Sequence, residues 1–165
     1  MHLRRSPRLP TFDYLGAYRY FVTICADCRA VAFVDRAAVD LVMLHLRRTA
    51  AEFQFAVIAY CFMPAHLHLL VEGAAEASDF LEFMRSFKQR SAFYWKRARG
   101  ATLWERSYFE HVLREDEDTK SVARYILGNP VRAGLVEDPL DYQFLGSLTL
   151  DVRDLLDSVR EQGRT

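Results

Sequence analysis

The chain has 165 residues, of which 51% are hydrophobic, so it can bury a core and is not intrinsically disordered. Its 22 basic and 22 acidic side chains cancel to a formal net charge of zero, which at first sight argues against a nucleic-acid partner. No apolar run is long enough to span a membrane, and the basic N-terminus is not followed by the apolar segment of a secretory signal. We therefore expect a cytoplasmic protein of one domain.

Three cysteines are present, and two of them form a single CxxC motif, Cys25 and Cys28. A zinc ribbon needs a second such pair, which the chain lacks. A redox CxxC usually opens a helix, whereas this one ends a strand-like run. We therefore expect these two residues and Cys61 to be reduced structural thiols, with redox or metal chemistry as the alternative.

Hydrophobic periodicity divides the first half of the chain into a strand, a helix and two further strands. Residues 18–25 are aromatic and β-branched, which is typical of a strand. Apolar residues at helical spacing follow over 35–52, with an aspartate in the N-cap position. Residues 53–63 and 65–72 predict two more strands, and Pro64 between them indicates a tight connection or a bulge between antiparallel neighbours.

The second half begins with a long helix over 79–100, capped by a serine or aspartate and stopped by a glycine. A strand over 104–114 and a helix that starts in the acidic run 115–118 and ends near residues 128–130 follow. A last amphipathic stretch covers 151–160. The order β-α-β-β-α-β-α predicts an α+β fold of the ferredoxin-like sandwich type: an antiparallel sheet with helices on one face, plus a C-terminal helix.

The clearest chemical feature is a histidine pair, His66 and His68, on the third predicted strand. Residues two apart on a strand share one face and lie about 6.6 Å apart along it. Leu67 and Leu69 would then point into the core. Two imidazoles on one face can converge on a metal if a third ligand arrives from elsewhere, but ordinary strand histidines show the same spacing, so both interpretations stay open.

Among the eight tyrosines, Tyr125 has a polar neighbour at helical spacing, Asn129. Four residues apart on a helix, they share one face, and Pro130 would end the helix just after them. Docked beside the histidine strand, this helix could present a phenol and an amide oxygen to one centre. The alternative is a packed tyrosine with its hydroxyl at the rim and an asparagine C-cap. Tyr108 is the main rival as a functional tyrosine.

Several segments together resemble a known family. MPAHLHLLVE resembles the MPNHVHLL signature of the HUH single-tyrosine transposases, with Ala65 where the family usually has asparagine, a change that we expect to affect only the turn. LPTFDYLGAYRYFVTIC, SFKQR, LWERSYFEHVLREDED and RYILGNPVRAGLVED resemble, in the same order, the REP-associated tyrosine transposases of bacteria. The resemblance covers about residues 8–145. It suggests one transposase domain over 1–165 with a tail over 146–165.

The resemblance implies a role for each candidate residue. Tyr125 matches the catalytic tyrosine, and Asn129 matches the polar residue that completes a metal site with His66 and His68. Imidazole and amide ligands suit Mg²⁺ or Mn²⁺ better than a closed zinc site. The implied activity is metal-dependent cleavage and joining of single-stranded DNA through a 5′-phosphotyrosine. The implied substrate is a hairpin-forming repeat with an adjacent guide tetranucleotide, and the family leaves both monomer and homodimer open.

The zero net charge hides a segregated distribution. Residues 85–114 hold eight basic and two acidic side chains, whereas residues 115–165 hold six and eleven. Basic residues alternate with aromatic ones over 85–99, a composition that suits phosphates and unstacked bases but also fits a solvated helix face over a core. With a basic N-terminal arm, this predicts the following DNA-binding residues: Arg4, Arg5, Arg8, Arg85, Lys88, Arg90, Lys96 and Arg97.

Two other functions stay open beside the transposase. One is a hairpin-binding module without catalysis, and the other is a metal-dependent hydrolase that uses a water nucleophile in place of Tyr125. The acidic tail carries Asp151, Asp154 and Asp157. We expect it to pack as an amphipathic helix, with shielding of the DNA groove as the alternative.

Overall fold

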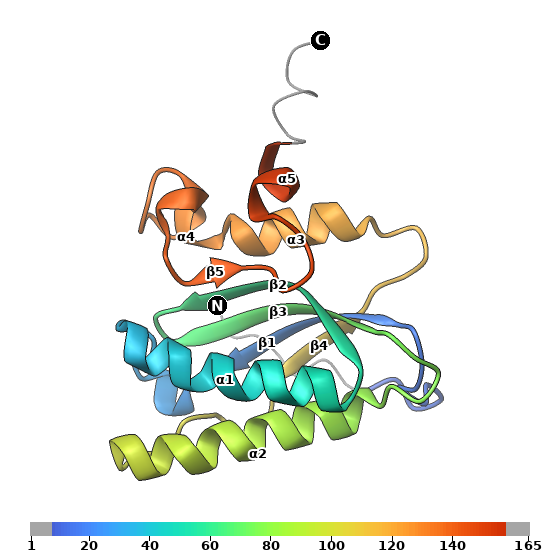
Figure 1. Cartoon of the computed structure of the whole chain (residues 1–165), viewed down its shortest axis with the longest axis horizontal. Coiled ribbons are helices and arrows are strands. Elements are labelled where there is room, and N and C mark those ends of the chain that lie inside the picture. Colours follow the sequence, from blue (N-terminus) through green and yellow to red (C-terminus); the bar gives the residue numbers. More distant parts are fainter. Residues whose placement is uncertain (1–7, 158–165) are drawn as a thin grey trace.

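The computed structural model describes residues 8–157, and its strands form one antiparallel sheet in the order β4-β1-β3-β2-β5 (Figure 1). This order places β3, the histidine strand, at the centre, paired with β1 on one side and β2 on the other. The strands are β1 Arg19–Cys25, β2 Phe55–Met63, β3 His66–Gly73, β4 Phe109–Val112 and β5 Leu145–Gly146.

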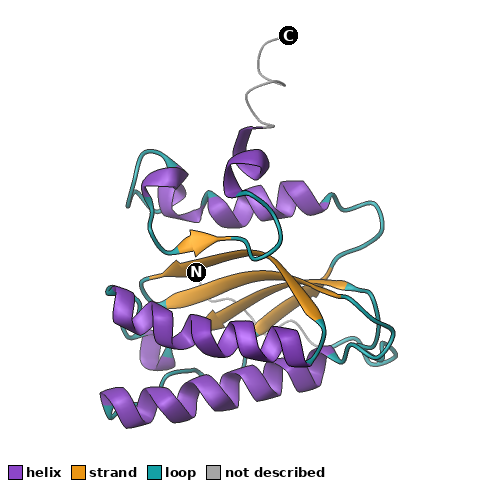
Figure 2. Ribbon diagram, viewed as in Figure 1, coloured by secondary structure: helices purple, strands orange, loops and turns teal. Residues whose placement is uncertain are grey.

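Helices cover both faces of the sheet, in two groups (Figures 1 and 2). The two long helices lie together on one face, and three shorter ones lie on the other. They are α1 Arg36–Glu52, α2 Phe80–Arg99, α3 Thr119–Leu127, α4 Asn129–Arg132 and α5 Val152–Asp157. This is the predicted α+β sandwich with an added C-terminal helix, and that helix, α3, packs on the face that α1 and α2 leave open. Within residues 8–157, none of these helices has the length and hydropathy needed to cross a membrane.

Local sequence signals account for the ends of the long helices. The Asp35 carboxylate accepts a hydrogen bond from Ala38 N at 2.8 Å and caps α1, as predicted. Of the two candidates for α2, Asp79 is the cap, since it accepts from Glu82 N at 3.0 Å. Gly100 ends α2 in the left-handed conformation at φ 68°, which glycine adopts at little cost.

The alternation of side chains along β3 builds two separate cores. Leu67 and Leu69 are fully buried under α1 and α2, in the same core where Tyr20 and Phe80 stack at 3.8 Å between ring centroids. The opposite face of the sheet packs against α3, including its buried Ile126. The histidines therefore face α3, as the predicted direction of the leucines requires.

Three boundaries differ from the sequence predictions. The strand predicted over 104–114 is confined to β4. Before β4, the Lys88 ammonium binds the carbonyls of Glu105 and Arg106 at 2.9 and 3.1 Å, and pairing with the end of β1 returns only as an isolated bridge between Ala26 and Trp104. The helix predicted from residue 115 starts at Thr119, where Asp118 caps it. The short strand β5 has no counterpart among the predictions, and it pairs with β2.

Candidate active site

The two histidines of β3 converge on one point. His66 Nε2 lies 3.0 Å from His68 Nε2, and the two rings meet edge to face. At this distance, either one Nε2–H donates a hydrogen bond to the other Nε2, or the lone pairs of both nitrogens are directed at a shared cation. The pair therefore forms a two-nitrogen ligand set in the layer between the sheet and α3.

Both imidazoles are held in the neutral form. Burial lowers the pKa of His68 to about 3, with further lowering by the neighbouring His66 and by the charge of Arg132. Burial, aided by the charge of Arg29, also lowers the pKa of His66. Neutral imidazole is the form that binds metals, so the site presents ligand-competent nitrogens at neutral pH.

Thr23 of β1 orients His68 from behind. Its hydroxyl Oγ1 lies 2.8 Å from His68 Nδ1, and the threonine is 2% exposed. When Nδ1 donates its hydrogen to this oxygen, Nε2 keeps a free lone pair directed toward His66. Hydrogen bonding at the second ring nitrogen is the common way in which proteins fix the tautomer of a metal-ligating histidine.

The turn before the histidines is tight and anchored. Pro64 and Ala65 form a two-residue connection between Met63 and His66, which pair directly across β2 and β3. The Ala65 carbonyl accepts from Ala26 N at 2.9 Å, and the Pro64 carbonyl accepts from two further backbone amides. Pro64 thus marks the predicted tight connection. The backbone carbonyls of this turn therefore anchor the start of β3.

The sequence predicted a single helix that carries Tyr125 and Asn129 and ends at Pro130. The structure divides this segment into two helices. Helix α3 ends at Leu127, Gly128 joins it to α4, and Pro130 lies in the first turn of α4. Because proline has no N–H, it cannot bond the Ile126 carbonyl four residues back. Asn129 Nδ2 donates to that carbonyl at 3.2 Å instead. This leaves Asn129 Oδ1 as the acceptor available to a ligand.

Tyr125 stands at the surface of α3 on the histidine side of the sheet. Its side chain is 54% exposed, and its ring meets the edge of Phe21 at 6.2 Å between centroids. Phe21 in turn stacks on the imidazole of His68 at 5.8 Å. One aromatic ring therefore contacts both Tyr125 and His68. Tyr125 is too exposed to be the packed tyrosine of the alternative interpretation, although Asn129 does bond a carbonyl at the end of α3 as that interpretation expected.

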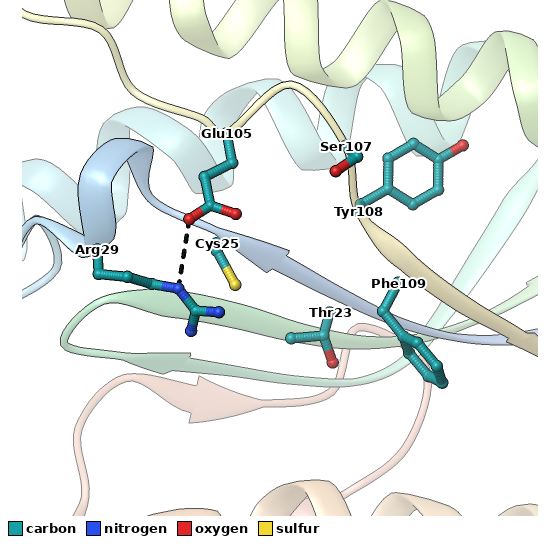
Figure 3. Close-up of a pocket in the computed structure, with 7 residues that line it drawn as sticks. All are labelled: Thr23, Cys25, Arg29, Glu105, Ser107, Tyr108 and Phe109. Atoms are coloured by element: carbon teal, nitrogen blue, oxygen red, sulfur yellow. Dashed lines mark ion pairs between the residues drawn. The ribbon is translucent and has the colours of Figure 1, made fainter. Parts of the chain in front are cut away.

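The rival tyrosine lies in the other layer. Tyr108 packs edge-on against Phe80 of α2, with the Lys88 ammonium 5.3 Å from its ring centroid. Burial, followed by the charge of Glu110, raises the pKa of Tyr108 to about 12. Figure 3 shows its hydroxyl pointing away from Thr23. Tyr108 is therefore unsuited to act with the histidines.

A cavity of about 30 Å³ adjoins Thr23 on the side of β4 (Figure 3). Arg29 lies at its edge, where its Nε forms a 3.3 Å ion pair with Glu105. The cavity has room for a water-sized group, and Arg29 supplies a cation near the histidine pair. It is lined by Thr23, Cys25, Arg29, Glu105, Ser107, Tyr108 and Phe109.

The cysteines show the features of structural thiols. All three are free, with Cys25 and Cys61 buried and Cys28 exposed. Burial raises the pKa of Cys61 to about 12 and also raises that of Cys25, which suppresses the reactive thiolate. The prediction of reduced thiols fits this arrangement.

The predicted metal ligands fit a divalent cation with an open coordination sphere. Among residues 8–157, no cluster of three or more imidazole, thiolate or carboxylate side chains could hold a metal. Any third protein ligand beside the histidine pair would therefore be of another type, and the predicted one is Oδ1 of Asn129, which accepts no described hydrogen bond. Two imidazoles and an amide leave positions for water and phosphate oxygens, as Mg²⁺ and Mn²⁺ prefer.

The structure divides the predicted DNA-binding cations. On α2, Arg85 pairs with Glu82 and Arg90 with Glu52, and Lys88 binds backbone carbonyls. Lys96 and Arg97 are exposed near the end of α2, and Arg97 lies over the exposed ring of Phe93. The whole of α2 lies across the sheet from α3, the helix that contains Tyr125 (Figure 1). Arg8 is exposed, and Arg4 and Arg5 lie outside the described residues, so these DNA contacts stay predictions.

Sequence reasoning missed three residues that shape the site: Phe21, Thr23 and Arg132. Phe21 and Thr23 face the histidines only because β1 pairs with β3 in the observed register, in which Thr23 lies opposite His68. Residues two apart on a strand share one face, but this spacing does not show which strand lies beside them. The Arg132 guanidinium lies 4.1 Å from the ring centroid of Tyr125. Its position depends on the helix break at Gly128 and on α4 after it; the sequence predicted a helix end near residues 128–130 but not the second helix.

Comparison with known proteins identifies the family. The family model described as "Transposase IS200 like" matches residues 15–129, which is most of the chain. The chain therefore belongs to the IS200-like transposase family and is a DNA transposase by descent.

Relatives and a solved structure agree with this assignment. A Haemophilus influenzae protein assigned to the REP-associated tyrosine transposases is 24% identical over 143 residues, covering 80% of this chain and 81% of the relative. The Escherichia coli REP-associated tyrosine transposase is 28% identical over 91 residues, covering 54% of this chain and 53% of the relative. The solved structure of a REP-associated tyrosine transposase bound to a REP hairpin shares the fold, with a TM-score of 0.71 and 21% identity over 87% of this chain and 82% of that one.

Proposed function

We propose that this transposase cuts and rejoins single-stranded DNA at hairpin-forming repeats, with Tyr125 as the nucleophile and a divalent metal at His66, His68 and Asn129. The observation that carries the proposal is the exposed Tyr125 ring linked through Phe21 to the converging imidazoles. The REP-associated relatives, and a REP-associated transposase solved with a REP hairpin, support hairpin DNA as the substrate. The adjacent guide tetranucleotide is part of the proposal.

The covalent step conserves the number of phosphoester bonds. Tyr125 Oη attacks a phosphorus, a tyrosine O–P bond forms, and the bond from phosphorus to O3′ breaks. The phenol proton passes to solvent and O3′ takes up a proton, which leaves a 5′-phosphotyrosine and a free 3′-hydroxyl. Joining is the reverse step with another 3′-hydroxyl, so no nucleotide cofactor is required.

Three side chains would hold the cation, through the Nε2 atoms of His66 and His68 and through Asn129 Oδ1. A bound Mg²⁺ or Mn²⁺ would polarise the scissile phosphate and stabilise the departing oxygen. Thr23 fixes the His68 ring, and Phe21 fixes the spacing between that ring and the phenol. Since Tyr125 and Phe21 belong to one chain, we expect a site completed within one subunit, whether the protein is a monomer or a homodimer.

The test is covalent capture of labelled DNA. A single-stranded hairpin oligonucleotide with its flanking bases is incubated with Mg²⁺ or Mn²⁺, and the SDS-stable adduct is measured for the wild type, Tyr125→Phe and Tyr108→Phe. We expect no adduct with Tyr125→Phe, unchanged hairpin affinity, and a normal adduct with Tyr108→Phe. An undiminished adduct in Tyr125→Phe would overturn the assignment of the nucleophile.

The same assay distinguishes the alternatives. A binding module without catalysis shifts the hairpin in a gel but yields neither product nor adduct at any metal concentration. A hydrolase with a water nucleophile yields cleaved DNA without an adduct, and Tyr125→Phe cleaves as fast as the wild type. Either result would replace the proposed mechanism.

A further inference from the structure

Arg132 is built into the site beside Tyr125 by two contacts. Its guanidinium carbon lies 4.1 Å from the ring centroid of Tyr125, within the range of a cation–π interaction. The same guanidinium donates a hydrogen bond from Nη2 to the Tyr125 carbonyl. One side chain thus contacts both the ring and the backbone of the proposed nucleophile.

The phenol ring is held from two directions. Phe21 meets it edge to face at an interplanar angle of 85°, and Arg132 covers it at the closer distance. A tyrosine that is 54% exposed would otherwise sample several rotamers about its Cα–Cβ bond. Contacts from Phe21 and Arg132 restrict it while leaving the hydroxyl open to substrate.

Gly128 provides the room that Arg132 requires. A Cβ atom at position 128 would lie 2.8 Å from Arg132 Nη1 and 3.2 Å from the Arg124 carbonyl. Gly128 itself has φ −82° and ψ −5°, a conformation that alanine adopts readily. A side chain at position 128 would therefore be opposed by lack of space and not by backbone strain, and the group that would have to move is the Arg132 guanidinium.

We propose that Arg132, seated over Gly128, is a positioning residue that holds the Tyr125 phenol in the orientation for attack on DNA. This inference rests on the proposed function of Tyr125 and adds a residue to it. A purely structural role is also available to Arg132, since a cation at the end of α3 stabilises the last carbonyls of that helix. The test must therefore separate positioning from helix stability.

The experiment compares Arg132→Ala, Arg132→Lys, Gly128→Ala and the double variant Gly128→Ala/Arg132→Ala, with Lys120→Ala as an exposed cation control on α3. Single-turnover adduct formation, hairpin affinity and thermal unfolding are measured for each. We expect Arg132→Ala to slow adduct formation by about 10–100-fold at unchanged hairpin affinity, since small misplacements of a reacting group cost rates of this order. Arg132→Lys should recover part of the loss.

The glycine variant supplies the sharper comparison. Gly128→Ala keeps the Arg132 charge but displaces the guanidinium, so it should slow adduct formation as well. In the Arg132→Ala background the added methyl has no guanidinium to displace, and the double variant should be no slower than Arg132→Ala alone. Losses that multiply in the double variant, a wild-type rate in Arg132→Ala, or a loss explained fully by weaker hairpin binding or by unfolding would overturn the inference.

A second measurement does not depend on activity. In the DNA-free protein with ¹³C-labelled tyrosine, the ring signal of Tyr125 is assigned by its absence from Tyr125→Phe. It should shift in Arg132→Ala and Gly128→Ala and stay in place in Lys120→Ala. An unchanged signal in the first two overturns the positioning role. If the signal shifts in these two variants but the wild type forms no adduct, the contact is supported and only the proposed function is overturned.

Discussion

His66 and His68 place their Nε2 atoms 3.0 Å apart, closer than two strand residues of the same face would lie without ring rotation. The rotation of His68 is set by Thr23, whose hydroxyl holds Nδ1 on the opposite side of the ring. A buried threonine on a neighbouring strand thus determines where the histidine pair presents its lone pairs.

Replacing Thr23 with valine tests this relationship with almost no change in volume. We expect Mn²⁺ affinity to fall by about 10–100-fold, the usual cost of removing a hydrogen bond behind a metal ligand. Isothermal titration calorimetry of the DNA-free protein measures the affinity. Thr102→Val, at an exposed position, is the matched control. Equal Mn²⁺ affinity in Thr23→Val and wild type would show that Thr23 does not set the ligand geometry.

Acid should destabilise the metal-free fold through His68. Its pKa is about 3 in the folded chain and near 6.5 in an unfolded one, so between these values the unfolded state binds more protons. The stabilisation is present above pH 6.5 and is lost as the pH falls toward 3, at up to about 1.4 kcal/mol per pH unit. Urea unfolding with EDTA present measures this slope. His68→Gln should have a shallower slope than the wild type, and identical slopes would contradict the assignment.

The docking of α5 should contribute stability without blocking DNA. Leu155 is 2% exposed in the core beneath α3, and Arg124 Nε bonds the Leu155 carbonyl at 3.0 Å. We expect Leu155→Ala to lower the free energy of unfolding by about 2–5 kcal/mol, as for other buried leucines, while the exposed Asp154→Ala has little effect. Hairpin affinity should stay unchanged. A rise in affinity when α5 is loosened would favour shielding by the acidic tail.

The basic residues of α2 should not contribute equally to DNA binding. Lys96 and Arg97 have no carboxylate partner among the described ion pairs, whereas Arg85 and Arg90 already have theirs. We expect Lys96→Ala/Arg97→Ala to weaken hairpin binding and to reduce the salt dependence of log K by about 1–2, one unit for each lost phosphate contact. Fluorescence anisotropy at several salt concentrations measures this. Equal losses in Arg85→Ala/Arg90→Ala would show that the intramolecular pairs open on binding.

Much of the fold follows from local sequence signals. The alternation around His66 predicted which face the histidines take, and Asp35, Asp79 and Gly100 marked helix ends, because each acts within a few residues of its own backbone. The pairing of Tyr125 with Asn129 came from spacing and from the family resemblance. The two residues lie in different helices and not in one, because Pro130 lacks the N–H that would continue α3.

Other features depend on contacts between distant segments. The strand predicted around Arg106 is interrupted where Lys88, 18 residues earlier, binds the Arg106 carbonyl. Strand β5 exists only by pairing with β2, and Thr23 reaches His68 across 45 residues of chain. Such contacts require the register of the sheet, which short-range patterns do not specify.

The separation of the site residues along the chain also determines when the enzyme becomes competent during synthesis. Chains emerge from the ribosome N-terminus first, so β1, β2 and β3 with the histidine pair are made well before α3. The proposed nucleophile and Arg132 arrive only with the last third of the sequence. On the proposed mechanism, a nascent or truncated chain that lacks this part would hold two of the three metal ligands and no attacking group, and would be unable to nick DNA.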